Sequence, residues 1–187
     1  MVESPGEAEA QCAWLTKVGL ADAVIGEDYD TLAFGGTSLI RNFSRGEASM
    51  EIDREALIDA LEISEEQFLD FCILCGCDYL PKISGIGPVK ALKFIKENGN
   101  LEGVVEHLMG SEKLRRKHPV PDDFNYLIAR RLFTHPEVVE VKEEEVRESP
   151  CQEEELEKFL LEREFDEKRI SRWIEKMRYF TERAAHL

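Results

Sequence analysis

Five acidic residues stand at the predicted ends of helices and strands rather than along their flanks: Glu7, Glu9, Asp28, Asp30 and Asp78. In an α/β fold, ligand sites form where the carboxyl ends of strands meet the amino ends of helices. Converging carboxylates repel one another, and hard cations such as Mg²⁺ or Mn²⁺ remove that repulsion because they prefer oxygen ligands. Two such ions about 3.5–4 Å apart can hydrolyse a phosphodiester bond. The five residues are therefore candidate metal ligands.

Each of these carboxylates also has a purely structural interpretation. Glu7 can complete a helix capping box, and Glu9 complements the dipole of the same helix. Asp28 and Asp30 are typical turn residues, and Asp78 is a polar residue after a helix. Taken singly, the structural interpretation is favoured for each residue. Taken together and in this order, they favour a metal site.

A short glycine-containing segment, residues 82–90, is the second stretch whose residues indicate a function. Its two glycines allow a tight turn whose backbone N–H groups can reach a phosphate, and the following proline starts a helix whose amino end favours an anion. Lysines on that helix can contact a DNA backbone without reading its sequence. The segment resembles a helix-hairpin-helix of the helix-two-turn-helix type. The predicted DNA contacts are Ser84, Gly85, Ile86, Gly87, Lys90 and Lys93.

The net charge of −15 is unusual for a DNA-binding protein, but it is unevenly distributed. The formal balance is −13 over residues 1–79, +4 over residues 80–131 and −6 over residues 132–187. A positive middle flanked by acidic segments fits a protein that grips phosphate in one place and binds metal ions in another. On charge alone, a solvated acidic surface with a chance basic stretch fits equally well.

Hydrophobic spacing and capping residues predict the elements that position these groups. A helix is expected to open at a capping box formed by Ser4 and Glu7 and to end at Gly19. Strands are expected at residues 21–25, 38–42 and 50–53, and helices at residues 54–61, 64–76, 88–98, 101–109, 124–133, 153–161 and 166–180. Alternation of helices and strands up to residue 79 implies an α/β layer with parallel strands. The remainder is predicted to be all-helical.

Composition excludes several classes of protein. With 43% apolar and 34% charged residues, the chain is typical of a soluble globular protein. No run approaches the about 18–20 apolar residues of a membrane span, and the N-terminus lacks the features of a secretory signal. The cysteines are odd in number and lack a second pair at zinc-binding spacing, which favours reduced structural thiols. They are Cys12, Cys72, Cys75, Cys77 and Cys151.

Four blocks, in this order and spacing, resemble the signatures of the flap endonuclease and XPG-type structure-specific 5′ nucleases: residues 4–10, 27–30, 76–79 and 85–87. The similarity continues through residues 129–133, 136–138, 153–156 and 169–170, and so covers nearly the whole chain. This tail is more similar to flap endonuclease proper than to the exonuclease or repair branches of the family.

The resemblance implies a fold and a domain plan. Residues 1–79 would be part of a PIN-like parallel-sheet nuclease core, residues 80–135 a helix-hairpin-helix DNA-binding region, and residues 136–187 an acidic wrapping segment with C-terminal helices. The five carboxylates match the metal-ligand positions of the family, which implies two Mg²⁺ ions, with Mn²⁺ able to substitute. The hairpin matches the element that grips the uncleaved strand, often with a bound K⁺.

The implied activity is a structure-specific 5′ flap endonuclease and 5′–3′ exonuclease, which acts on branched or flapped double-stranded DNA in replication and repair. The expected location is the nucleus, or the cytoplasm for a prokaryotic or viral protein. Family members carry an earlier region with further metal carboxylates, a catalytic basic pair and a helical arch, so a missing N-terminal half is the expected partner. The sliding-clamp motif of the family is not found after Phe180. The alternative is a non-catalytic, split or truncated fragment that grips duplex DNA through the hairpin.

Overall fold

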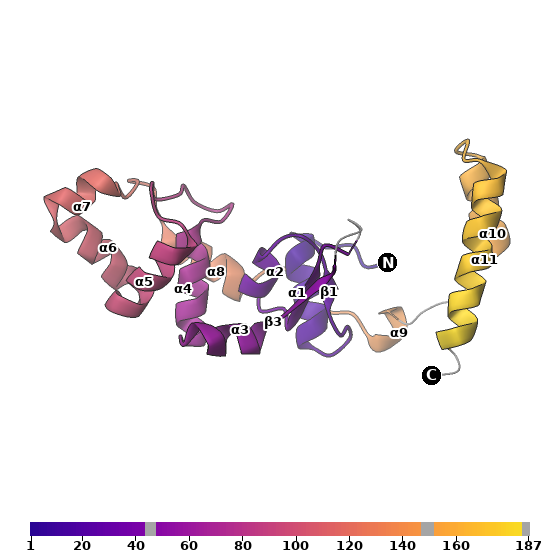
Figure 1. Cartoon of the computed structure of the whole chain (residues 1–187), viewed down its shortest axis with the longest axis horizontal. Coiled ribbons are helices and arrows are strands. Elements are labelled where there is room, and N and C mark those ends of the chain that lie inside the picture. Colours follow the sequence, from indigo (N-terminus) through magenta and orange to yellow (C-terminus); the bar gives the residue numbers. More distant parts are fainter. Residues whose placement is uncertain (44–47, 147–151, 185–187) are drawn as a thin grey trace. The chain divides into compact units, whose positions relative to one another are not determined.

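The computed structural model describes residues 1–43, 48–146 and 152–184 (Figure 1). It divides into two compact units, Met1–Val146 and Arg147–Leu187, and each is described by itself. No helix in the described part of the chain is long and apolar enough to cross a membrane. The division predicted at residues 79 and 135 stays a prediction.

The first unit contains a three-stranded sheet in the order β1-β2-β3, made of Val24–Ile25, Ser38–Arg41 and Met50–Asp53. Strand β1 pairs with β2 in parallel, as predicted, whereas β3 pairs with β2 antiparallel. The prediction of parallel strands is therefore wrong for the second pair. The physical reason is the connection at residues 42–49, because a parallel crossover needs about a dozen residues or more.

Helix α1, Ala8–Lys17, begins without the predicted capping box. Glu7 is its N-cap residue but makes no side-chain capping bond, and the Ser4 hydroxyl instead donates to the Glu7 carbonyl at 2.9 Å. The end of the helix agrees with the prediction, because Gly19 follows it with a φ of 75°. The chain then returns to the helix through a bond from the Ala21 N–H to the Leu15 carbonyl, so β1 is shorter than expected.

Two capped helices follow the sheet at the predicted places. The Asp53 side chain accepts from the Ala56 N–H at 2.7 Å and starts α3, Arg54–Leu61. Helix α4, Glu65–Cys75, opens with a capping box between Ser64 and Gln67. Its buried face contributes Leu69, Ile73 and Leu74 to the main core of the unit.

The remaining helices of the first unit are α5 (Pro88–Asn98), α6 (Leu101–Gly110), α7 (Glu112–Lys117), α8 (Tyr126–Thr134) and α9 (Glu143–Val146). The sequence did not predict α7 and α9, which are short and have no buried residue. It also did not predict α2, Asp30–Ala33. One apolar cluster joins Ala13 of α1 to Ile95 of α5 and Phe133 of α8. The buried strand residues Val24 and Leu39 lie in a second cluster, and Phe71 and Cys72 of α4 pack against both clusters.

The second unit is a pair of helices, α10 (Glu153–Leu161) and α11 (Glu167–Ala184), both expected from the sequence. Ile170 and Ile174 of α11 are buried. The Arg178 Nε donates to the Glu153 carboxylate at 2.7 Å and links the two helices.

A buried carboxylate ties together three helices of the first unit. Asp70 of α4, 2% exposed, accepts the Leu101 N–H at the start of α6 at 3.0 Å. Arg130 of α8 lies 2.8 Å from the same carboxylate and reaches Glu102 of α6, also at 2.8 Å. Burial raises the pKa of Asp70, although the bonds from the Leu101 N–H and from Arg130 oppose the shift. The hydrogen bonds and the ion pair thus offset part of the free-energy cost of burying the Asp70 carboxylate.

Removal of this arginine is expected to destabilise the first unit. Arg130→Ala leaves the buried Asp70 without its cation and should lower the free energy of unfolding by roughly 3 kcal/mol or more. Arg131→Ala is the matched control, because Arg131 is the exposed neighbour on α8. The measurement is an unfolding curve in urea, monitored by circular dichroism. Equal midpoints for the two variants would show that the network contributes no net stability.

Candidate functional site

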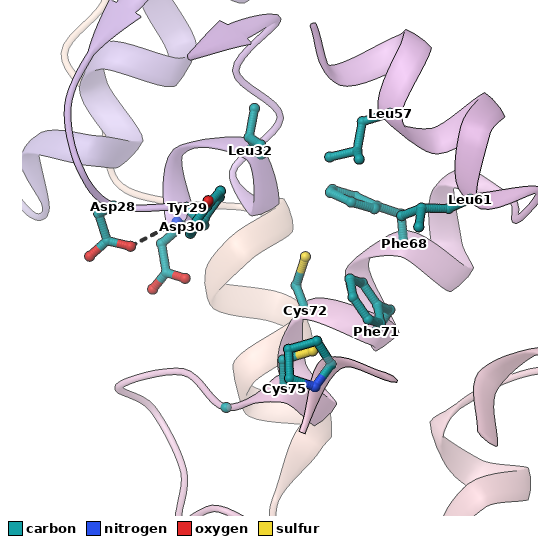
Figure 2. A pocket seen from close by; sticks show the side chains of 12 residues that line it. Asp28, Tyr29, Asp30, Leu32, Leu57, Leu61, Phe68, Phe71, Cys72 and Cys75 are labelled. Atoms are coloured by element: carbon teal, nitrogen blue, oxygen red, sulfur yellow. Dashed lines mark hydrogen bonds between the residues drawn. The ribbon is translucent and has the colours of Figure 1, made fainter. Parts of the chain in front are cut away.

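The carboxyl end of β1 leads directly into two of the predicted metal ligands. Directly after the strand, the Gly26 N–H donates to the Ile40 carbonyl, and Asp28 and Asp30 follow in the chain. Asp30 is the first residue of α2, and its N–H donates to Asp28 Oδ1 at 2.9 Å. Figure 2 shows the two side chains next to each other at this turn. One short loop therefore presents both carboxylates.

The electrostatics of Asp30 link it to the other predicted ligands. Its pKa is raised from 3.8 to about 6, first by burial and then by the charges of four carboxylates. These are Asp28, Asp78, Glu7 and Glu9. Desolvation and nearby like charges both disfavour the charged form of a carboxyl group and so raise its pKa. The fold therefore brings the other four predicted residues within electrostatic reach of Asp30.

The five side chains do not form a closed chelate. Within residues 1–43, 48–146 and 152–184, no three His, Cys, Asp or Glu side chains are arranged to hold a metal ion. The donor chemistry nevertheless fits Mg²⁺, which binds through one or two carboxylates and keeps several waters or substrate phosphate oxygens. Asp28 and Asp30 provide such a pair. Their assignment as metal ligands stays a prediction.

Glu7 has a neighbour that the sequence did not reveal as important. Burial, and then a hydrogen bond with Glu7, raise the pKa of Tyr79. The Tyr79 ring also packs edge-on against Phe133, with centroids 5.1 Å apart. Tyr79 directly follows Asp78, so the same short segment holds one predicted ligand and orients another.

An apolar pocket of about 500 Å³ adjoins the Asp28–Asp30 turn (Figure 2). Phe68 and Phe71 of α4 line it together with the thiols of Cys72 and Cys75. Burial raises the pKa of Cys72, and it raises that of Cys75 to about 11. Both thiols are therefore protonated near neutral pH and are poor nucleophiles and metal ligands.

The cysteines agree with the prediction of structural thiols as far as the structure describes them. Cys12, Cys72, Cys75 and Cys77 are free. Cys151 lies outside the described residues.

The predicted DNA-binding hairpin is a tight turn that packs against the buried side chain of His118. Gly85 has a φ of 71°, and a Cβ atom there would lie 3.1 Å from the His118 ring. His118 is 2% exposed, and its Nδ1 lies 2.8 Å from the Ser84 carbonyl oxygen. Ile83 and Ile86 are buried beneath the turn. No signal in the sequence pointed to His118, because it lies 34 residues from its partner.

The hairpin continues into exposed lysines on α5. Pro88 occupies the first turn of this helix, as predicted. Lys90 Nζ donates to the Gly85 carbonyl at 2.6 Å, and Lys93 lies 3.7 Å from Glu97. His118 directly follows α7, whose last turn carries Arg115, Arg116 and Lys117. The predicted contacts thus share one region of the first unit with the basic helix α7, which the sequence did not predict.

Sequence comparison relates the chain to known nucleases. Residues 1–78 match the family model of the XPG I-region. The chain is 46% identical to a flap endonuclease 1 of Micromonas commoda over 92% of this chain and 45% of that protein. It is 41% identical to the flap endonuclease 1 of Saccharomyces cerevisiae over 94% of this chain and 47% of that protein. The chain spans about half the length of the curated relatives it matches.

Solved structures give the same relationship at lower identity. The flap endonuclease-1 of Methanococcus jannaschii superposes with a TM-score of 0.73 at 27% identity, over 94% of this chain and 51% of that one. The catalytic core of Rad2 gives 0.71 at 27% identity, over 84% and 60%. The predicted fold class, an α/β nuclease core with a helical part, is thereby confirmed. In sequence and in fold, the chain is similar to flap endonucleases and XPG-type nucleases.

Proposed function

We propose that the chain is the metal-binding and duplex-gripping part of a structure-specific 5′ flap endonuclease that also acts as a 5′–3′ exonuclease. Its substrate is branched or flapped double-stranded DNA, and its reaction is hydrolysis of phosphodiester bonds in replication and repair. The observation that supports this most directly is the convergence of four carboxylates on Asp30. Such like-charge clusters are typical of sites that bind divalent cations.

The residues of the chain have distinct roles in this proposal. Asp28 and Asp30 hold Mg²⁺, or Mn²⁺ in its place, while Glu7, Glu9 and Asp78 complete the negative field around a pair of ions. Bound ions would lower the pKa of a water molecule and neutralise charge on the phosphate. Tyr79 orients Glu7, and α2 fixes the direction of Asp30. The carboxylates themselves form no covalent bond with DNA.

The hairpin grips the DNA backbone away from the metal site. Ser84, Gly85, Ile86 and Gly87 present backbone groups to a phosphate, and the lysines of α5 add charge. A K⁺ ion at the hairpin is also proposed, since a related structure of the junction-resolving enzyme GEN-1 binds potassium, with a TM-score of 0.63 at 27% identity. A nuclear location is proposed because the matched relatives include eukaryotic flap endonucleases.

A second candidate function is a DNA-binding module without catalytic activity. It is favoured by the absence, among the described residues, of three side chains arranged around one ion. Metal binding and cleavage distinguish the two functions.

The metal site is tested by the substitutions Asp28→Ala and Asp30→Ala, singly and together. In an enzyme completed by the other half of the relatives' length, either change, or Asp78→Ala, should reduce cleavage by several orders of magnitude. Duplex binding should persist, and stability should not fall, because a repelling charge is removed. Asp22→Ala, at an exposed carboxylate outside the cluster, is the control. Near-normal cleavage by the double variant would refute the assignment.

The DNA grip is tested by Lys90→Ala and Lys93→Ala. Each change should weaken duplex binding similarly for all sequences and reduce the slope of log affinity against log salt by about 0.9 for each phosphate that the variant no longer neutralises. Lys142→Ala, at an exposed lysine in the acidic part of the first unit, should leave the slope unchanged. Fluorescence anisotropy at several salt concentrations provides the measurement. If both Lys90→Ala and Lys93→Ala keep the salt dependence of the parent, these lysines only form a solvated helix face.

Residues 1–187 alone are expected not to cleave a 5′ flap at a useful rate. The carboxylates are too loosely arranged to align water and phosphate, and small misplacements cost about 10²-fold in rate. Strand β1 also lies at the edge of the sheet with Ile25 58% exposed, which favours association with another strand.

The assay for this expectation uses a labelled flap with Mg²⁺ or EDTA. Addition of the other half, in the same chain or as a second chain, should reduce self-association and give Mg²⁺-dependent cutting near the flap junction. A completed enzyme carrying Asp28→Ala controls for contaminating nucleases. Robust, EDTA-sensitive cleavage by residues 1–187 alone would contradict the expectation.

A further inference from the structure

Arg41, at the end of β2, contacts both neighbours of Asp28 in the chain. Its guanidinium lies over the Tyr29 ring, 4.2 Å from the centroid, and its Nη1 donates to the Tyr29 hydroxyl. Its Nη2 donates to Glu27 Oε2 at 3.2 Å. The other oxygen of Glu27 accepts the Asn42 N–H at 2.9 Å. The end of β2 therefore clamps the loop that leaves β1 at two points, one on each side of Asp28.

We propose that Arg41 is a positioning residue for the metal-binding carboxylates, an inference that rests on the proposed metal site. Strand β1 has only two residues, so its pairing with β2 gives the following loop little support. Repulsion among the carboxylates drives Asp28 and Asp30 apart when no cation is bound. By holding Glu27 and Tyr29, Arg41 fixes the backbone on which both carboxylates stand. It touches neither of them in the proposed role.

The hydrogen bonds of Arg41 allow its effect on the position of the carboxylates to be distinguished from its effect on folding stability. Its Nε is buried and has no hydrogen-bond partner in the described part of the chain. An unsatisfied buried donor lowers stability. Lysine has no such group, so Arg41→Lys removes this penalty. However, a single ammonium group cannot lie flat on Tyr29 and reach two acceptors as the planar guanidinium does. The substitution therefore keeps the charge and removes the clamp.

The test measures binding of Mn²⁺ to the purified full chain by electron paramagnetic resonance, with thermal unfolding in EDTA as a second measurement. Arg41→Lys should weaken Mn²⁺ binding about tenfold or more, which is the usual effect of removing a group that orients a metal ligand. The unfolding midpoint should not fall. Glu27→Gln and Tyr29→Phe each remove one interaction of the clamp and should each weaken binding by a smaller factor.

Two controls make the outcomes distinguishable. Arg163→Ala removes an arginine that stacks on Phe159 in the other unit, 3.5 Å from the ring centroid, and should bind Mn²⁺ as the parent does. Asp28→Asn removes a proposed ligand and should abolish binding. Parental affinity in Arg41→Lys, with no binding in Asp28→Asn, overturns the role of Arg41 and leaves the metal site intact. Parental affinity in Asp28→Asn overturns both.

A structural role for Arg41 predicts a different result. In that case the weaker affinity of Arg41→Lys would be accompanied by a lower unfolding midpoint in EDTA, and the inference would be wrong. If Arg41→Lys does not fold, Glu27→Gln and Tyr29→Phe decide the question. Parental Mn²⁺ affinity in both of these folded variants overturns the proposal, whereas weaker binding at an unchanged midpoint supports it.

Discussion

The burial of Asp30 beside four other carboxylates is the constraint on which the rest of this structure depends. Burial first, and then the charges of these four neighbours, raise the pKa of Asp30 to about 6. A fold holds like charges together only when the backbone that carries them is fixed by other interactions. Here the fixing elements are the end of β1, the short helix α2, the start of α1 and the segment after α4.

Helix α4 connects this acidic cluster to the rest of the first unit. Asp78 follows its end, while Asp70 in its interior binds Arg130 of α8 and the start of α6. The main apolar cluster of the first unit, to which α4 contributes, also contains residues of α5, the helix that follows the hairpin. A shared core and a buried ion pair therefore join the carboxylate cluster to the hairpin. In a flap endonuclease, such a rigid connection would set the distance between the gripped duplex and the bond that is cut.

Local rules predicted those elements whose signals are local. Helices α3, α4 and α5 form in the predicted ranges. Asp53 and Ser64 cap the first two and Pro88 starts the third, because a cap or a fixed φ acts within one helical turn. The same kind of argument failed for Ser4, whose hydroxyl donates to the backbone of Glu7 rather than receiving a bond from the helix. It also missed α2, α7 and α9, which are too short to produce a hydrophobic period.

The sequence by itself determined the resemblance to flap endonucleases, the residue types of the site and most of the helices, because motifs and hydrophobic periodicity depend on residues that are close together in the chain. Only the tertiary structure decided which groups meet. Arg41 at the end of β2 reaches Tyr29 on the loop after β1, and His118 supports the hairpin from 34 residues away. The raised pKa of Asp30 likewise depends on charges from three separate segments. Such contacts depend on chain folding over long separations, where sequence spacing no longer constrains distance.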